Sequence, residues 1–424
     1  MPAEVADHPA DAAQPGESQH SHFPCFDGLR AIAATAVVFH HVGFSTGYGV
    51  NGHFGAYFAH GDSGVSVFFL ISGFLLYRPF VARHLSGERP MSADRFWWRR
   101  ILRIVPGYWA ALIGIYLVFG FRDGTLSSPG DFLAYFGFAQ IYDPTRFFSG
   151  IDQAWSLATE LSFYAFLPLY AWGIGRLGAR WLRHRVHIEI VGLVALVVTC
   201  VVWRLAWWVN ETTVQQTAAG VQPTRGQVGE LATAYWLPSH FDLFALGMGL
   251  AVASAWVAHR GVAPRLVQWV GRVPELWWAL AALTYWAVST RVGLPRSLGE
   301  GLTQGEYFMR QALYGLTAFF LLLPAVFGDQ DKGVVRRFLR WAPVAYVGLV
   351  SYGVYLWHKA WIEFVREDIL GHDEPIGGPV VSTLVIAFAF TLVTATVSYY
   401  LLERPILRFK DNPPWRRSSR AAQV

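Results

Sequence analysis

Arg30 and His41 are two ionisable side chains that stand eleven residues apart in the first long apolar stretch of the chain. At about 100° per residue this spacing makes three helical turns with roughly 20° left over, so a helix places both side chains and Asp27 on one stripe. His41 then lies about 16 Å further along the helix than Arg30. A neutral imidazole can take a proton from a hydroxyl group and later return it. The alternative is a histidine that only hydrogen-bonds a neighbouring helix.

Arg100 and Arg103 form a second candidate site, because they stand one helical turn apart and share a face. Proline suits the first turn of a helix, so we expect the next helix to begin near Pro106. The planar forks of paired guanidiniums match phosphate groups. Those phosphates belong either to lipid headgroups or to a cytosolic cofactor, and the two arginines alone leave both open.

Glu160 is the candidate carboxylate inside an apolar segment, on one helix face with Ser156 and Phe163. An ionisable group within a bilayer is costly unless it is paired or hydrated, which makes it a candidate for function. The alternative is a structural ion pair or hydrogen bond between helices. Asp242 stands near the outer end of another apolar segment and is a candidate for the same cavity.

Tyr355 and His358 are one helical turn apart in a later apolar segment, and we expect both to face the interior of the protein. Hydrogen bonding between helices is the alternative role for this pair.

The composition is that of a membrane protein made of many helices. Of the 424 residues, 54% are hydrophobic and 15% are charged, whereas soluble domains have roughly 45–50% apolar and about 25% charged residues. The apolar excess excludes a disordered chain, and two cysteines exclude a disulfide scaffold. A net charge of +5 is too small to indicate nucleic-acid binding. No zinc-ligand motif or phosphate-cradling glycine loop occurs, so we expect no metal and no permanently bound cofactor.

The predicted fold is an all-α bundle of about ten transmembrane helices, because a bilayer core needs about 20 apolar residues per span. Most Lys and Arg residues fall in alternate connections, which places both termini in the cytoplasm. The predicted spans are 28–45, 62–83, 105–121, 154–174, 188–208, 236–257, 275–290, 308–328, 345–365 and 379–402.

Three regions make up the predicted domain organisation: a disordered cytoplasmic tail over 1–26, a transmembrane domain over 27–403 and a basic cytoplasmic tail over 404–424. The acidic first region has no basic start and no cleavage pattern, so it is not a signal peptide. Segment 131–141 is apolar but too short to cross the bilayer, and we expect an interfacial helix or a lid there. Cys25 and Cys200 are not expected to pair.

Six stretches in this order resemble the type-3 acyltransferase family, integral-membrane bacterial O-acyltransferases of envelope polysaccharides, glycolipids and some secondary metabolites. Any one of them is weak evidence, and together they cover nearly the whole chain. They are Phe26-Asp27-Gly28-Leu29-Arg30 with His41; Gly64 to Leu76, including Ser72; Arg99-Arg100-Ile101-Leu102-Arg103 with Pro106; Trp155-Ser156-Leu157 with Glu160, Phe163 and Tyr164; Ser351 to His358; and Glu403-Arg404-Pro405.

The resemblance implies a membrane-bound enzyme that transfers acetyl or another short acyl group from cytosolic acyl-CoA to a hydroxyl group. The family's Arg/Lys-x10-His motif falls on Arg30 and His41, which gives His41 rather than His40 the role of general base. The family's RxxR motif falls on Arg100 and Arg103, which are implied to contact the CoA phosphates.

We expect further residues around this reaction. Glu160 is expected to orient His41 or bind the sugar, and Arg30 to help hold acyl-CoA. The substrate-binding candidates are Asp27, Ser72, Ser156, Tyr164, Asp242, Tyr355 and His358.

The expected acceptor contains a sugar: an envelope glycan, a glycolipid or a glycosylated metabolite. The expected location is the bacterial inner (plasma) membrane, with the lipid bilayer as surroundings. Two features depart from many relatives. Ser66 stands where they carry an acidic residue, and we expect no soluble hydrolase-like domain after the last span. The enzyme is therefore expected to act directly on its acceptor or to pass the acyl group to a separate extracytoplasmic protein.

A transporter of a small polar or acylated solute is the competing interpretation, because helices with buried polar groups also serve transport pathways. Against it, the sequence has no matching halves with broken helices, and the basic cluster lies at a surface entrance. A non-catalytic membrane scaffold is the third interpretation, and it would not need the Arg30–His41 stripe.

Overall fold

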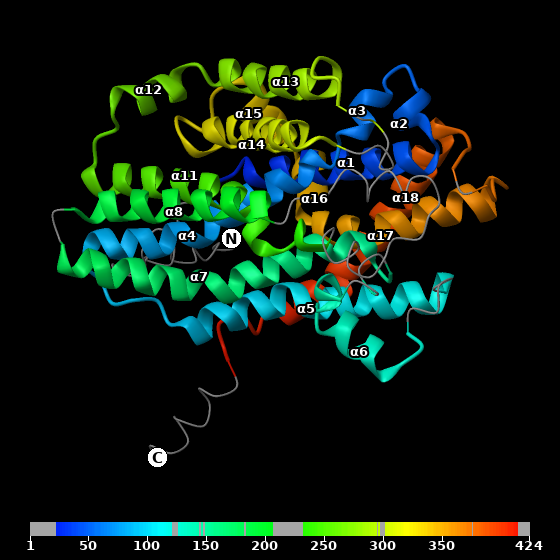
Figure 1. Cartoon of the computed structure of the whole chain (residues 1–424), viewed down its shortest axis with the longest axis horizontal. Coiled ribbons are helices and arrows are strands. Elements are labelled where there is room, and N and C mark those ends of the chain that lie inside the picture. The colour runs from blue at the N-terminus through cyan, green and yellow to red at the C-terminus, as the bar shows by residue number, and fades with distance from the viewer. Residues whose placement is uncertain are drawn as a thin grey trace, which may run out of the picture.

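The computed structural model describes residues 23–120, 126–143, 146, 149–181, 184–206, 232–294, 296, 302–374 and 376–413. Every element in these ranges is helical, and the long helices run roughly alongside one another (Figure 1). Among the described residues, six segments are long and apolar enough to cross a membrane: Ser63–Ser86, Ala93–Phe119, Arg185–Ala206, Leu237–Arg260, Gln304–Val326 and Val380–Leu407. The predicted all-helical membrane bundle is therefore confirmed, whereas the number of ten spans stays a prediction.

Each of the ten predicted spans falls on a helix or on a pair of helices. In chain order these are α1 (Phe26–Ser45), α4 (Ser63–Ser86), α5 (Ala93–Phe119), α7 (Trp155–Arg180), α8 (Arg185–Ala206), α11 (Phe241–Arg260) preceded by the 3-10 turn η4 (Leu237–His240), α13 (Pro274–Thr290), α14 (Gln304–Val326), α16 (Ala342–Leu349) with α17 (Ser351–Phe364), and α18 (Val380–Ser398).

Helix α5 corrects one expectation, since no new helix begins at Pro106. The helix starts after Ser92, whose hydroxyl accepts the Arg95 backbone N–H, and it continues through Pro106 to Phe119. Proline is tolerated inside helices packed in a bundle, where neighbouring groups satisfy the freed carbonyl. As a consequence, Arg100 and Arg103 lie within a long continuous helix rather than at its start.

Helices α4 and α11 pack closely because each presents a glycine to the backbone of the other. A methyl group on Gly73 would overlap the carbonyl oxygen of Phe244, and one on Gly247 would overlap that of Leu70. Small residues permit such close approach between membrane helices, where dispersion contacts replace the hydrophobic effect. This contact fixes the helix that carries Ser72.

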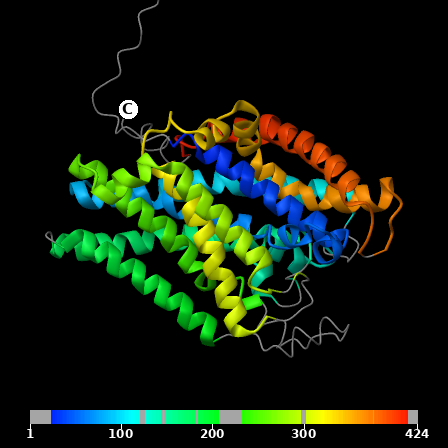
Figure 2. The ribbon, with the colours of Figure 1, turned by 90° about the horizontal axis from the view of Figure 1, so that it is seen from above.

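Helix α1 lies inside the bundle and contacts α4, α16 and α17 (Figure 2). The predicted ninth span is broken between α16 and α17, and π-helical turns follow at Val365–Ile369. The α16 backbone reaches α1 because Gly348 packs against the carbonyl oxygen of Asp27, where a side chain would overlap.

Short elements occupy the connections. They are α2 (Tyr48–Asn51), α3 (Gly55–Ala59), α6 (Pro129–Phe136), the 3-10 turns η1 (Gln140–Tyr142) and η2 (Asp152–Ala154), α12 (Arg265–Arg272), α15 (Val334–Leu339) and α19 (Arg404–Leu407), which follows the π-helical turns η6 (Tyr399–Glu403). The predicted interfacial segment 131–141 contains most of α6 and the start of η1. Ser128 caps α6 by accepting the backbone N–H of Asp131.

The two predicted tails lie mostly outside the described residues, which begin at 23 and end at 413. The last residues of the first predicted tail lie against the helices, and the division into three regions stays a prediction. The rings of Phe23 and Phe74 meet edge to face at 4.8 Å, and Cys25 is fully buried. The burial of apolar side chains holds this segment against α4. Cys25 and Cys200 are both free thiols.

Candidate active site

His41 and His358 come together where α1 crosses α17. The His41 Nδ1 lies 3.1 Å from the His358 Nε2, and the ring centroids are 4.8 Å apart. The His358 Nδ1 lies 2.8 Å from the carbonyl oxygen of Tyr355, while the His41 Nδ1 lies 3.0 Å from that of Val37. His358 is fully buried and His41 is partly buried.

These contacts assign the protons of the two neutral rings. A carbonyl oxygen can only accept, so the His358 Nδ1 must donate and its Nε2 must accept. The His41 Nδ1 then donates, both to the His358 Nε2 and to the Val37 carbonyl. Because a neutral imidazole carries one proton, this arrangement leaves the lone pair of His41 on Nε2.

A cavity of about 130 Å³ lies between α1, α4, α5, α7 and α17. Eight of the residues singled out in the sequence contribute to its lining: Arg30, Ser72, Arg100, Arg103, Ser156, Glu160, Tyr164 and Tyr355. The family-type stretches, far apart in the sequence, therefore meet around one space.

Glu160 is the acceptor of a hydrogen-bond network within this cavity. Its Oε1 accepts the hydroxyl protons of Ser72 and of Tyr164, the latter over 2.7 Å. These contacts hold the carboxylate between α4 and α7, whereas the hydrogen-bond partners of His41 are Val37 and His358. His358 rather than Glu160 is thus the side chain that contacts His41.

Three arginines gather at the end of the cavity near the start of α1, its basic end, and two of them have carboxylate partners. Arg30 forms an ion pair with Asp27 over 2.7 Å, and Arg103 lies 3.8 Å from Glu403. The Nε of Arg100 is buried without a hydrogen-bond partner among the described residues. A guanidinium with unused donors is suited to bind an anionic group that enters the cavity.

Tyr355 joins the cavity to the histidine pair. Its hydroxyl lies 2.7 Å from the Ser156 Oγ and donates to the Gln153 carbonyl oxygen over 2.7 Å. The Tyr355 carbonyl oxygen accepts the Nδ1–H of His358, which lies one turn further along α17. The histidines themselves are outside the residues that line the cavity.

Two other expected substrate-binding residues also lie outside this lining. Asp27 borders it only through its ion pair with Arg30. Asp242 forms a bidentate pair with Arg204, at 2.7 and 3.0 Å, and Arg204 also donates to the Ser239 carbonyl oxygen. The geometry therefore gives Asp242 a structural contact between α8 and α11.

Glu403 is a site residue to which the sequence reasoning gave no role. The π-helical turns at the end of α18 bring it, 4% exposed, to Arg103. A signal was present, since Glu403 belongs to the Glu-Arg-Pro stretch at the end of an apolar segment. Lys359 was similarly overlooked; it forms an ion pair with Asp152 beside the histidine pair.

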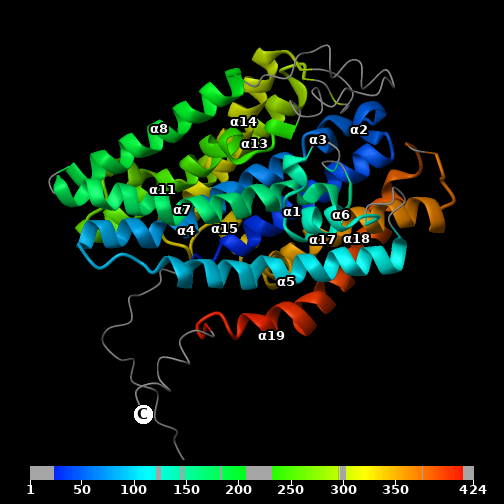
Figure 3. The same cartoon turned by 60° about the horizontal axis from the view of Figure 1, so that its bottom comes forward.

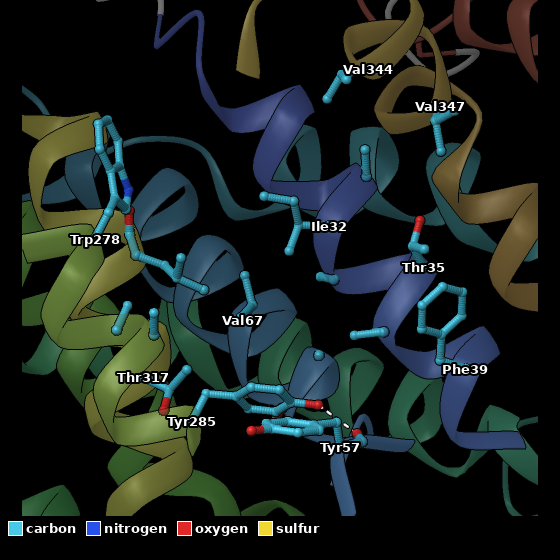
Figure 4. Close-up of a pocket in the computed structure, with 18 of the residues that line it drawn as sticks. Ile32, Thr35, Phe39, Tyr57, Val67, Trp278, Tyr285, Thr317, Val344 and Val347 are labelled. Atoms are coloured by element: carbon cyan, nitrogen blue, oxygen red, sulfur yellow. Dashed lines mark hydrogen bonds between the residues drawn. The ribbon is translucent and has the colours of Figure 1, made fainter. Parts of the chain in front are cut away.

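A second, larger space of about 720 Å³ lies between α1, α13, α14 and α16 (Figure 4). Ile32, Thr35 and Phe39 of α1 line one wall of this space, and the Tyr285 hydroxyl donates to the Tyr57 carbonyl oxygen at one end. At about 100° per residue, this wall is the face of α1 opposite to Arg30 and His41. Among the described residues, the lining of this space contains no carboxylate, histidine, lysine or arginine.

A comparison with protein families supplies the next observation. The family described as "Acyltransferase domain" matches residues 23–403, which is nearly the whole chain and includes all the cavity arginines, Glu160 and both histidines. The chain belongs to the type-3 acyltransferase family.

This type-3 acyltransferase is similar to several curated proteins. It is 24% identical over 398 residues to the peptidoglycan O-acetyltransferase OatA of Listeria monocytogenes, which covers 90% of this chain and 55% of that protein. It is 25% identical over 414 residues to the putative membrane-bound transacylase BcsY of Komagataeibacter xylinus, covering 94% and 86%. The O-acetyltransferase OatA of Staphylococcus aureus is 21% identical over 402 residues, covering 91% and 57%. The chain thus spans about half the length of the two OatA proteins, and no solved structure matches it significantly.

Proposed function

We propose that this type-3 acyltransferase moves acetyl or another short acyl group from cytosolic acyl-CoA to a hydroxyl group of a sugar-containing acceptor in the bacterial plasma membrane. His41 acts as general base. The observation that carries the proposal is the hydrogen-bond chain from the Tyr355 carbonyl through His358 to His41, because it leaves the Nε2 lone pair free for a substrate proton.

The reaction balances with the residues present and a thioester donor. The His41 Nε2 takes the proton of the acceptor hydroxyl while that oxygen attacks the thioester carbonyl carbon. The carbon–sulfur bond breaks, and the CoA thiolate leaves with the proton returned by the imidazolium. The thioester supplies the activation, so the proposal requires no metal or redox cofactor.

The basic end of the cavity supports acyl-CoA as donor. Arg30, Arg100 and Arg103 stand within one space, and guanidinium groups bind phosphate through paired hydrogen bonds. Arg100 has an unused donor there. The carboxylate of Glu160, held by Ser72 and Tyr164, would place the two hydroxyl groups against the bound donor.

The acceptor class rests on the relatives. The similar proteins of Listeria monocytogenes and Staphylococcus aureus are named O-acetyltransferases, the first for peptidoglycan. We propose an envelope glycan as the first acceptor to test, ahead of a glycolipid or a glycosylated metabolite. Transfer through a separate extracytoplasmic acyl-carrying protein is part of the same proposal.

The test is an acyl-transfer assay with the purified protein in lipid nanodiscs, acetyl-CoA labelled in the acetyl group, and peptidoglycan fragments. We expect release of free CoA together with labelled acceptor. We also expect His41→Ala to lower the rate by about 10²–10⁴-fold, as for loss of a general base.

The control variant is His40→Ala, because the His40 imidazole contacts the Ala59 carbonyl oxygen instead of His358. Full activity of His41→Ala would overturn the catalytic assignment. Uptake of a solute by proteoliposomes without CoA release would support the transporter and refute the enzyme.

A further inference from the structure

A pocket of about 620 Å³ opens at the end of the bundle where α4 ends and α8 begins. This is the end that the distribution of Lys and Arg places in the cytoplasm. The side chains that line it include Arg83 and His84 from α4, Trp172 and Arg176 from α7, and Arg185 from α8. None of them belongs to the candidate active site.

The pocket continues the candidate active-site cavity along the same helices. On α4, Leu76 lines the cavity and Phe80, one turn later, lines the pocket. On α7, Tyr164 lines the cavity and Pro168 lines the pocket. Helices α4, α5 and α7 lie side by side in Figure 3, so the two spaces follow one another along a common path.

Three aromatic rings separate the two spaces. The Phe80 and Phe96 ring centroids are 5.7 Å apart, and those of Phe96 and Tyr164 are 6.5 Å apart. All three side chains are buried. A ligand that occupies both spaces must pass this partition with a narrow part of its structure.

The pocket has positive charge that its own carboxylates do not neutralise. Glu88 pairs with Arg83, and the buried Glu189 accepts the Tyr77 hydroxyl over 2.5 Å and contacts the His84 ring. In the described part of the chain, neither Arg176 nor Arg185 has a carboxylate partner. Arg185 gives one N–H to the Leu85 carbonyl oxygen, which leaves the positive charge of both guanidiniums for an external anion.

Arg176 also stands over an aromatic face, with its guanidinium carbon 4.8 Å from the Trp172 ring centroid. Such a pair gives a flat base a surface on which to stack. Sixteen residues of α7 separate Arg176 from Glu160, which is about 24 Å along the helix axis. One molecule serves both places only if a long, thin arm connects its charged head to its reactive end.

We propose that this pocket binds the adenosine 3′-phosphate end of the CoA donor, with Arg176 and Arg185 on the 3′-phosphate and Trp172 against the adenine. The proposal rests on the proposed function, which supplies acyl-CoA as the donor. The diphosphate of CoA passes the aromatic partition to Arg100 and Arg103, and the slender pantetheine arm carries the thioester onward into the cavity.

Phosphate also occurs in lipid headgroups, so the experiment must separate a nucleotide phosphate from a phospholipid. The probes are CoA and dephospho-CoA, which lacks only the 3′-phosphate. Binding of each to the full-length protein in nanodiscs of zwitterionic lipid is measured by equilibrium dialysis. We expect CoA to bind about tenfold more tightly, as for one charge-assisted contact.

The decisive variant is Arg176→Gln combined with Arg185→Gln. We expect it to reduce the preference for CoA to about twofold or less while dephospho-CoA affinity stays within about twofold. Trp172→Ala should weaken both ligands but leave 4′-phosphopantetheine, which has no adenine, unchanged. The control is Arg260→Gln, because Arg260 stands over Trp256 at 4.9 Å in the same manner at the end of α11, outside the pocket.

The outcomes distinguish the two proposals. A tenfold preference that survives in the double variant would overturn the pocket assignment and leave the proposed function intact. Loss from the double variant of the phosphatidylglycerol that co-purifies with the unmodified protein, with an unchanged CoA preference, would identify a lipid site and overturn it as well. Binding of neither CoA nor dephospho-CoA to the unmodified protein would refute the donor, and with it both proposals.

Discussion

At the scale of single residues, the His41 ring is defined by what surrounds its Nδ1. Both neighbours of that atom, the Val37 carbonyl and the His358 Nε2, act as acceptors. The side chain is therefore held in one tautomer before a substrate arrives. Preorganisation of this kind lowers the cost of reaching the reactive geometry.

Replacement of His358 tests this positioning role. We expect His358→Ala to lower the transfer rate about tenfold, because one hydrogen bond of about 1.5 kcal/mol to His41 is lost. His358→Gln should recover most of the rate, since its amide oxygen can accept the same proton. The measurement is kcat at saturating donor for both variants. Equal rates for the Ala and Gln variants would show that His358 acts only by filling space.

Arg100 is expected to act on the donor rather than on the acceptor. Its guanidinium lines the cavity with an unused donor atom, so Arg100→Gln should raise the Kd for acetyl-CoA about tenfold. Acceptor affinity should not change. Arg99→Gln is the matched control, because Arg99 pairs with Asp411 outside the cavity. An unchanged Kd for Arg100→Gln would leave this arginine a lipid-anchoring role.

Asp242 is expected to matter for stability. It neutralises Arg204, whose side chain is only 4% exposed, and removal of one partner leaves a buried charge. We expect Asp242→Ala to destabilise the folded protein by about 3–5 kcal/mol, measured as a lower Tm in detergent. Lost acceptor binding at an unchanged Tm would instead return Asp242 to the substrate-binding residues.

At the scale of helices, the contact of α4 with α11 positions the cavity. We expect Gly73→Ala to cost about 1–3 kcal/mol, because the added methyl group meets the Phe244 carbonyl oxygen. Gly173→Ala is the control, since nothing lies within 4 Å of a methyl group there. Thermal unfolding of both variants should give a lower Tm for the first alone. A shared Tm would mean that the two helices separate easily.

The sequence predicted where most of the helices lie but not where they begin and end. Hydropathy placed each predicted span on helical segments, because mean hydropathy depends only on the local composition of the chain. The helix start predicted from Pro106 was wrong, because α5 begins after the Ser92 cap and continues through the proline in its packed surroundings. The break between α16 and α17 lies beside a tertiary contact, that of Gly348 with Asp27, which the local sequence does not reveal.

The candidate site shows the same division. Motif spacing predicted that Arg100 and Arg103 share a helix face, since they are one turn apart, and both line one cavity with Glu160. The partner of His41 could not be read from the sequence, because His358 is more than 300 residues away and meets it only through helix crossing. By sequence alone, Asp242 could not be distinguished from the cavity residues, because its ion pair with Arg204 forms only in the folded protein.

At the scale of the whole molecule, the distribution of Lys and Arg predicts which surfaces face the cytoplasm. We expect Asn51→Cys in α2 to react with a membrane-impermeant maleimide added to intact cells, and Val262→Cys before α12 to react only after lysis. Both positions are exposed. The unmodified chain is the control, because Cys25 and Cys200 are buried. The reverse labelling pattern would invert the orientation and place the proposed donor pocket outside the cell.

The position of His41 along α1 has a consequence for transport across the bilayer. Eleven residues separate it from Arg30, about 16 Å along a helix in a hydrocarbon layer of roughly 30 Å. If the phosphates stay with the arginines, only a small uncharged fragment travels outward. Under the proposed function, the anionic carrier would stay in the cytosol, and acylation of the envelope would consume acetyl groups without exporting nucleotide.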